Sequence, residues 1–236
     1  MIVIIPALNE EDSIGLVLQE IPMKRVKQVI VVNNDSSDQT ACVATKHGAH
    51  VVHEPIRGYG KCCLTGIAEA RKDPADIVVF LDGDYSDHPE EMDQLLSKLD
   101  SGYDFVIGSR MLGKAKPGAL LPQARFGNWL ATTLTKWFFG GVAFSDLGPF
   151  RAIKWSSLER IKMCDEDFGW TMEMQVKAIS FGLKYTEVSV SYRKRVGVSK
   201  ITGTVCGTIK AGYKILYTIF KYRILSWIKS SSFSSK

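Results

Sequence analysis

Two aspartates, Asp82 and Asp84, flank Gly83 directly after an apolar run over 77–81. The run predicts a buried strand, and the glycine allows a tight turn at its end. On such a turn both carboxylates can face one point, where they repel each other unless a cation lies between them. A hard divalent cation prefers oxygen ligands and also binds substrate phosphates. Taken alone, the pair is as compatible with a solvated turn as with a metal site.

The elements around this turn alternate between strands and helices. Apolar runs predict strands over 2–5, 29–32, 49–53, 77–81 and 105–108, and helical spacing predicts helices over 11–21, 41–47, 62–71 and 89–99. This alternation predicts an α/β fold with a mainly parallel central sheet and helices on both faces. Ligands of such sheets bind at the carboxyl ends of the strands, where Asp82 and Asp84 lie.

The second half of the chain has a different rhythm. We expect helices over 126–139, 171–180 and 204–228, and a strand within 184–193. Charge also changes along the chain. Residues 1–100 hold 17 acidic and 9 basic residues, whereas residues 184–236 hold 1 acidic and 11 basic residues. A basic C-terminal part favours anionic partners such as phosphates or a membrane surface.

The predicted C-terminal helix has two different faces. Its apolar face comprises Val205, Ile209, Tyr213, Leu216, Phe220, Ile224 and Trp227, and Lys210, Lys214 and Lys221 form a stripe elsewhere. Four cationic side chains, counting Arg223, argue against a membrane-spanning helix. Two interpretations stay open: a helix lying in a membrane interface, or one packed on the protein core or on a second subunit of a homo-oligomer. The segment 129–139 is a second candidate for membrane contact. Nucleic acid is not expected as a partner, because the aromatic residues follow helical spacing beside lysines.

The expected location is the cytoplasm. Five cysteines without a CxxC pair indicate reduced thiols, and the first residues are too short an apolar run for a secretory signal. Together with the basic helix, this predicts a peripheral protein at the cytoplasmic face of a membrane.

Four motifs in order carry a resemblance to a known family. They are PALNEE (6–11), VVNNDSSDQT (31–40), RGYGKCCLTG (57–66) and LDGDYSDHP (81–89), and they resemble glycosyltransferase family 2 with its GT-A fold. Four more, GSR (108–110), SDLGPFRAI (145–153), TMEMQVKA (171–178) and EVSVSYRKRVGVSKI (187–201), are similar to the polyprenyl-phosphate hexosyltransferase branch, which includes dolichyl-phosphate mannose synthase. The resemblance implies a GT-A domain over 1–201. The pattern of the remaining residues predicts an amphipathic helical extension over 202–229 and a disordered tail over 230–236.

The resemblance also implies a donor site. The residues expected to bind the nucleotide sugar are Pro6, Ala7, Asn9, Glu10, Asn34, Lys61, Asp82 and Gly83. Asp82 and Asp84 would bind Mg²⁺ or Mn²⁺ against the diphosphate. Ser86 stands where relatives often have glutamine, and Asp87 could replace that ligand. Asparagines at 33 and 34 stand where the family has aspartates, which leaves UDP and GDP open.

Catalytic roles implied by the resemblance fall on Asp84, Asp146 and Arg151. Asp146 would orient or activate the acceptor, or else cap a helix or pair with Arg151. Acceptor or diphosphate groups would be bound by Arg151 and by Arg193, Arg195, Ser199 and Lys200. The last four lie on a loop that Gly197 allows to close.

The implied reaction is metal-dependent transfer of a hexose to a polyprenyl phosphate with inversion at the anomeric carbon. A phosphate acceptor is already anionic and scarcely needs a general base, which agrees with the lack of an obvious Ser-His or His-Asp pair. Two alternatives stay open: the same fold acting on a soluble or glycan acceptor, and a non-catalytic nucleotide-sugar-binding protein.

Overall fold

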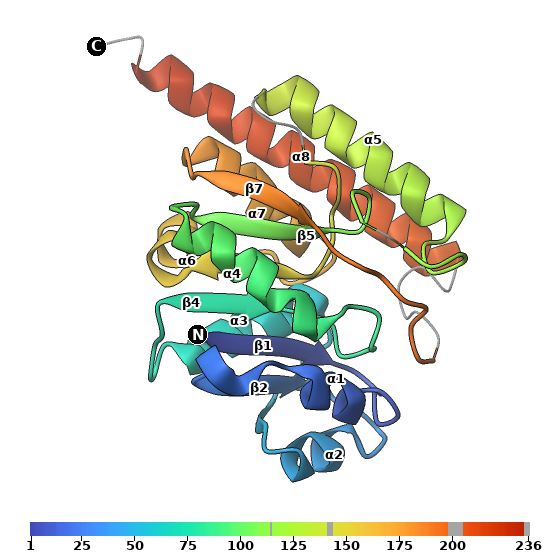
Figure 1. The fold of residues 1–236 in the computed structure, drawn as a ribbon. Coiled ribbons are helices and arrows are strands. Elements are labelled where there is room, and N and C mark those ends of the chain that lie inside the picture. Colours follow the sequence, from blue (N-terminus) through green and yellow to red (C-terminus); the bar gives the residue numbers. More distant parts are fainter. Residues whose placement is uncertain (114, 141–143, 198–204, 234–236) are drawn as a thin grey trace.

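The centre of the protein is one seven-stranded sheet with the strand order β3-β2-β1-β4-β6-β5-β7 (Figure 1). The computed structural model describes residues 1–113, 115–140, 144–197 and 205–233, with side chains over 207–227 in the last stretch. The strands are β1 (Ile2–Ala7), β2 (Gln28–Asn33), β3 (His50–His53), β4 (Ile77–Phe80), β5 (Phe105–Ser109), β6 (Arg151–Lys154) and β7 (Tyr185–Ser189).

Most neighbouring strands are parallel, as the alternating pattern predicts. β1 pairs in parallel with β2 and β4, β2 with β3, and β5 with β7. The exception is β6, which is antiparallel to both β4 and β5. The sequence pattern did not reveal β6, because this four-residue strand begins and ends with basic residues. The expected strand over 184–193 is shorter in the structure, where β7 ends at Ser189.

Helices cover both faces of the sheet. They are α1 (Ile14–Glu20), α2 (Thr40–Lys46), α3 (Tyr59–Ala70), α4 (Met92–Asp100), α5 (Pro122–Phe139), α6 (Trp155–Ile161), α7 (Trp170–Ser180) and α8 (Val205–Phe233), with short 3₁₀ turns η1 (Met23–Arg25) and η2 (Pro89–Glu91). Side chains alternate along each strand, so Val3 and Ile5 face one core with α1, α2 and α4. Ile2 and Ile4 face the other core with α3, α6 and α7.

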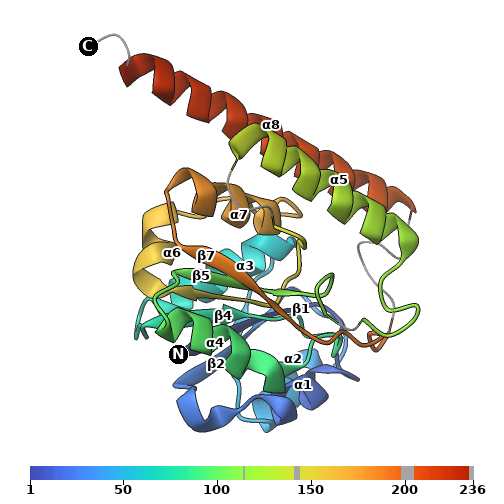
Figure 2. The same ribbon diagram turned by 45° about the horizontal axis from the view of Figure 1, so that its top comes forward.

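A further layer is formed by α5 and α8, which run side by side over α7 (Figure 2). Ala131 of α5, Met172 and Val176 of α7, and Ile219 of α8 form a small apolar core between them. α8 extends to Phe233, so residues 230–233 are helical where the sequence predicted the start of a disordered tail. Within the described residues, no helix combines the length and the apolar character needed to cross a bilayer.

Close packing of α3 on β1 gives a test of the fold. Gly66 lies so near β1 that a Cβ atom there would be 2.4 Å from Cγ2 of Ile4. Gly66→Ala is expected to lower the free energy of unfolding by about 1–3 kcal/mol through overpacking, measured by urea denaturation.

The matched control is Gly127→Ala on α5, where nothing lies within 4 Å of the added Cβ. Helix propensity should raise its stability by about 0.5–1 kcal/mol. Equal effects of the two substitutions would contradict the packing of α3 on β1.

Candidate active site

The turn after β4 brings three acidic side chains to the carboxyl edge of the sheet. Asp84 and Asp87 are each 2% exposed, and Asp82 is half-buried. The residue in left-handed conformation here is Tyr85, with φ of 64°, and not Gly83. The expectation that Gly83 supplies the conformational freedom of the turn is therefore wrong. A Cβ at position 83 would meet Ile14 and the Pro6 carbonyl at an ordinary 3.4 Å.

Each of the three carboxylates has different partners. Asp82 accepts a hydrogen bond from the Tyr59 hydroxyl at 3.1 Å. Asp84 Oδ1 accepts from the Ser86 main-chain N–H at 2.9 Å and from its hydroxyl at 2.5 Å. Asp84 Oδ2 forms an ion pair with the Arg195 guanidinium. Neither oxygen of Asp87 accepts a hydrogen bond from the part of the chain that the structure describes.

Burial and mutual repulsion raise the pKa values of two of these acids. Desolvation raises the pKa of Asp82, an effect that Arg195 opposes. Desolvation and the Asp82 charge raise the pKa of Asp87 to about 7. Burial is the first cause of both shifts, so the surrounding residues do not fully offset the cost of keeping these carboxylates charged.

A divalent cation fits this set of ligands. Asp82 and Asp84 would hold it, and a hard cation bound by one or two carboxylates normally completes its shell with phosphate oxygens and water. Within the described residues, no three His, Cys, Asp or Glu side chains converge on one point. The protein would therefore supply two carboxylates, with a diphosphate supplying further ligands.

The loops after β1 and β2 are tied to each other beside this turn. Asn9, with φ of 52°, donates its main-chain N–H to the Ser36 hydroxyl at 3.0 Å and accepts from the Ser37 N–H at 2.9 Å. The Glu10 N–H donates to the Thr40 hydroxyl at 2.8 Å. Pro6 and Ala7 end β1, so four of the residues predicted to bind the donor lie at the end of this strand and in the loop after it.

Asn34 is used differently from the prediction. It is 4% exposed, and its amide donates to the main-chain carbonyls of Glu54 at 3.0 Å and Ile56 at 2.8 Å. Its oxygen accepts from the Gly58 N–H at 2.9 Å. An aspartate here could not donate to either carbonyl. This arrangement explains the asparagine and makes Asn34 a positioning residue for the 54–58 loop, in place of the direct contact with a base edge.

Lys61 lies near the start of α3 and is held by a loop that sequence reasoning missed. Its ammonium group donates to the Glu166 carboxylate at 3.0 Å, and its main-chain N–H donates to the Glu166 carbonyl at 2.8 Å. A Cβ at Gly60 would lie 2.1 Å from the Asp165 carbonyl oxygen, so the glycine permits this approach. The loop around Glu166 therefore positions the Lys61 ammonium group.

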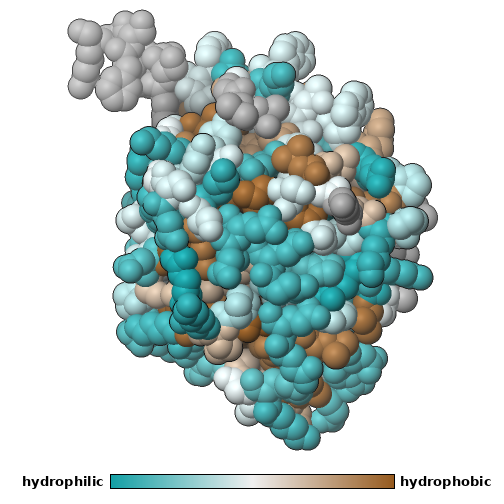
Figure 3. All heavy atoms as spheres, in the orientation of Figure 1, coloured by the Kyte–Doolittle hydropathy of each residue, from teal (hydrophilic) through white to brown (hydrophobic). Residues whose placement is uncertain are grey.

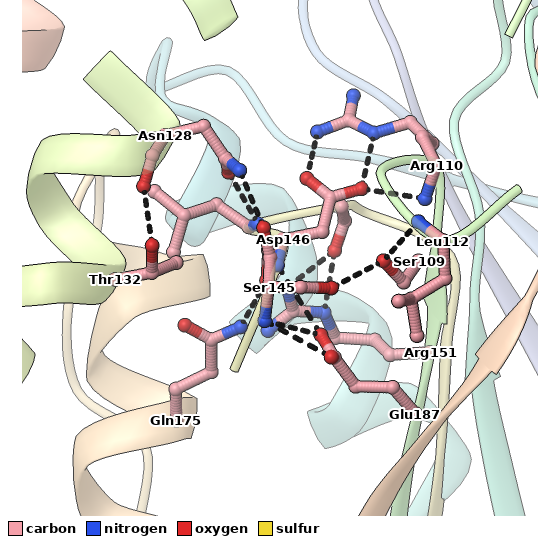
Figure 4. A network of polar contacts seen from close by, with 12 residues as sticks. Ser109, Arg110, Leu112, Asn128, Thr132, Ser145, Asp146, Arg151, Gln175 and Glu187 are labelled. Atoms are coloured by element: carbon pink, nitrogen blue, oxygen red, sulfur yellow. Dashed lines mark hydrogen bonds and ion pairs between the residues drawn. The ribbon is translucent and has the colours of Figure 1, made fainter. Parts of the chain in front are cut away.

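Asp146 pairs with Arg110, a partner that the sequence did not suggest (Figure 4). The guanidinium donates to both carboxylate oxygens, at 2.8 and 2.7 Å, and the Arg110 main-chain N–H adds a third bond at 2.8 Å. These contacts hold the pKa of Asp146 below its usual value despite burial. The GSR motif contains this arginine, but nothing local marks its partner.

The loop of Asp146 is fixed by side chains from three elements (Figure 4). Asn128 of α5 donates to the Ser145 carbonyl at 2.7 Å, and Gln175 of α7 donates to the Asp146 carbonyl at 2.6 Å. Glu187 of β7 accepts from the N–H groups of Ser145 and Asp146 at 2.9 and 3.2 Å. Its pKa is raised by burial. Hydrogen bonds from α5, α7 and β7 thus fix the backbone conformation of this loop.

Arg151 lies inside the protein and not at the surface of the site. It is fully buried, and its guanidinium donates to the carbonyls of Gly148 at 3.1 Å and Thr171 at 3.0 Å. Burial lowers its pKa to about 10. This arrangement gives Arg151 a positioning role for the Gly148 loop, in place of the predicted phosphate contact and the pair with Asp146.

The basic segment after β7 crosses the aspartate turn. Arg193 donates to the Tyr85 carbonyl at 2.7 Å and to Glu20 at 3.2 Å, and it stacks 3.5 Å from the centre of the Tyr85 ring. Arg195 reaches Asp84. Both arginines therefore lie at the predicted metal site. The predicted phosphate ligands Ser199 and Lys200 lie outside the described residues.

Comparison with known proteins agrees with this geometry. Residues 2–161 match glycosyl transferase family 2. An uncharacterised glycosyltransferase of Mycobacterium tuberculosis is 34% identical over 89% of this chain and 93% of its own length. Polyprenol monophosphomannose synthase of Mycolicibacterium smegmatis is 28% identical over 86% of this chain and 81% of its own.

A solved structure shares the fold. Glucosyl-3-phosphoglycerate synthase of Mycobacterium tuberculosis in complex with uridine diphosphate superimposes with a TM-score of 0.72 at 22% identity, covering 94% of this chain and 79% of that chain. At this identity the likeness shows the fold alone, which confirms the predicted GT-A architecture. The chain is a glycosyltransferase of the GT-A fold and belongs to glycosyl transferase family 2.

Proposed function

We propose that the protein transfers a hexose from a UDP- or GDP-linked sugar to a polyprenyl phosphate at a membrane surface, with inversion and with Mg²⁺ or Mn²⁺. The observation that carries this proposal is the meeting of Asp82 and Asp84 with the basic segment of Arg193 and Arg195 at the carboxyl edge of the sheet. Polyprenyl-phosphate relatives support the acceptor class, and solved structures of the same fold contain Mn²⁺ with UDP-glucose.

The chain's own residues would divide the work. The loops after β1 and β2 would bind the nucleoside, and Lys61 would approach its phosphates. Asp82 and Asp84 would hold the cation, which supplies charge neutralisation on the departing diphosphate. Arg193 and Arg195 would bind phosphate groups through their forked donors.

The electrostatics of Asp146 favour a phosphate acceptor over a hydroxyl acceptor. A hydroxyl nucleophile needs a base, but the Arg110 pair depresses the pKa of Asp146 and makes it a weak one. Asp87 has a suitable pKa, but it is only 2% exposed. A phosphate acceptor attacks with an oxygen that is already ionised. Asp146 would then orient Arg110 and the acceptor loop.

The outward face of the α5 and α8 layer fits a lipid surface. Its exposed apolar residues are Phe126, Trp129 and Trp137 on α5, and Ile209, Tyr213, Tyr217, Phe220, Ile224 and Trp227 on α8. Lys210 and Lys221 border this stripe on α8. In the space-filling view, brown and pale residues lie over this layer at the upper end of the molecule (Figure 3). Such a face suits the interface of an anionic membrane, with the lysines at the headgroups.

The donor site is tested by calorimetry with UDP and GDP, each with Mn²⁺ and with a chelator. Wild-type protein is expected to bind one nucleotide in a metal-dependent way. Asp84→Ala should weaken that binding roughly 30- to 150-fold, since losing one charged contact costs about 2–3 kcal/mol.

Asp93→Ala removes an exposed acid on α4 and serves as the charge control. It should bind nucleotide as the wild type does. If neither nucleotide binds under any condition, the transferase proposal fails. The alternative of a non-catalytic nucleotide-sugar-binding protein fails with it.

The membrane face is tested by co-sedimentation with vesicles of anionic and of zwitterionic lipid. Wild-type protein should sediment with anionic vesicles. The double variant Trp137→Ser, Ile224→Ser should bind them at least about tenfold more weakly, because each side chain loses about 2 kcal/mol of apolar burial.

Met23→Ser is the control, because Met23 is 57% exposed on η1 and lies outside the α5 and α8 layer. A wild-type protein that stays in solution with both vesicle types would contradict the membrane proposal. A concentration-dependent dimer under those conditions would instead assign the face to a second subunit.

A further inference from the structure

The predicted metal site contains a positively charged side chain, that of Arg195. The Arg195 guanidinium pairs with Oδ2 of Asp84, the oxygen that Ser86 leaves free. The Asp84 side chain is 3% exposed, whereas that of Arg195 is 27% exposed. Nε of Arg195 has no hydrogen-bond partner among the described residues. One end of this ion pair is therefore fixed and buried, and the other end reaches in from outside.

The backbone that carries Arg195 is held by other contacts. We call residues 191–196 the strap. The Ser191 N–H donates to the Glu91 carboxylate at 2.7 Å. The N–H groups of Arg193 and Val196 donate to the carbonyls of Ser86 and Asp84, each at 3.0 Å. The Arg193 side chain adds its contacts with Glu20 and Tyr85. The Arg195 side chain can therefore leave Asp84 while the strap stays in place.

The charges around the turn give Arg195 a specific task. Arg195 and then Arg110 are the cations that lower the pKa of Asp82 most. Arg110 is committed to Asp146 by three hydrogen bonds. Arg195 is thus the counter-charge of the Asp82 and Asp84 pair. A divalent cation on the same carboxylate would be repelled by that guanidinium at close range.

We propose that Arg195 and the divalent cation exchange on Asp84. The cation takes the carboxylate, and the released guanidinium binds the diphosphate of the nucleotide sugar, whose oxygens match its forked donors. This inference rests on the proposed function. Its consequence is that the cation binds weakly by itself and tightly together with nucleotide, so that Arg195 makes the two binding events cooperative.

The exchange is tested with Arg195→Gln by measuring Mn²⁺ binding alone, through the loss of the free-ion electron paramagnetic resonance signal, and then with UDP or GDP. Removing the competing charge should tighten binding of Mn²⁺ alone at least about tenfold. Binding of nucleotide in the presence of Mn²⁺ should weaken about tenfold or more, because a charge-assisted contact is lost. A residue that only contacts phosphate would produce the second effect without the first.

Two control variants separate the exchange from net charge. Lys194→Gln removes the same charge from an exposed neighbour and should leave both affinities unchanged. Arg195→Lys keeps the charge and should restore weak binding of Mn²⁺ alone. Thermal unfolding of each variant verifies that the strap and the sheet stay folded.

The outcomes distinguish failure of the exchange on Asp84 from failure of the proposed function. If Arg195→Gln binds Mn²⁺ alone no more tightly than wild type, the exchange is overturned, while metal-dependent nucleotide binding by wild type keeps the proposed function. If wild type binds neither Mn²⁺ nor nucleotide, both are overturned. Tighter Mn²⁺ binding in Arg195→Gln and in Lys194→Gln alike would show a general field effect and would also overturn the exchange.

Discussion

The site depends on the cost of keeping several carboxylates close together at a partly buried edge. Of the carboxylates of Asp82, Asp84, Asp87 and Asp146, two form ion pairs with described residues, Asp146 with Arg110 and Asp84 with Arg195. Removing charge from water is expensive unless each charge is paired and hydrogen-bonded. Asp146 and Asp84 are thus paired, whereas the Asp87 carboxylate has no hydrogen-bond partner within the described ranges. A divalent cation would neutralise the remaining negative charge, so the same feature that costs stability would supply the affinity for that cation.

The rest of the fold holds these charges in place. Parallel strands β1, β2 and β4 deliver their loops to one edge, and two apolar cores fix the strands from both faces. Polar side chains then specify the loops. Asn34 joins the ends of β2 and the 54–58 loop, and Glu187 fixes the backbone before Asp146. Repulsion between neighbouring carboxylates would favour moving the loops apart. These hydrogen bonds make other backbone conformations higher in free energy, so the carboxylates stay in position.

The sequence was sufficient for the features that depend on local pattern. Apolar runs located all five strands of the first half to within two residues, and the Asp82 and Asp84 turn fell where a strand end was expected. It was insufficient for pairs between distant residues. Arg110 and Asp146 are 36 positions apart, and nothing in either neighbourhood names the other. Asn34 could be read as a base contact because an amide offers donors and acceptors, but only the fold shows that carbonyls of the 54–58 loop use them.

One loop connects the layer of α5 and α8 to the start of α3. Asp165 forms an ion pair with Lys214 of α8 at 3.1 Å, and the next residue, Glu166, holds Lys61 at the start of α3. On the same side, Tyr222 of α8 donates to the buried Glu173 at 2.5 Å, which also pairs with Lys177. These contacts join α8 to the body by polar bonds as well as by apolar packing. If the acceptor phosphate lies at the height of lipid headgroups, the position of α8 relative to α3 sets its distance from the nucleotide sugar. The loop with Asp165 and Glu166 supplies that connection, which is a physical reason for acidic residues at this place in an otherwise basic half of the chain.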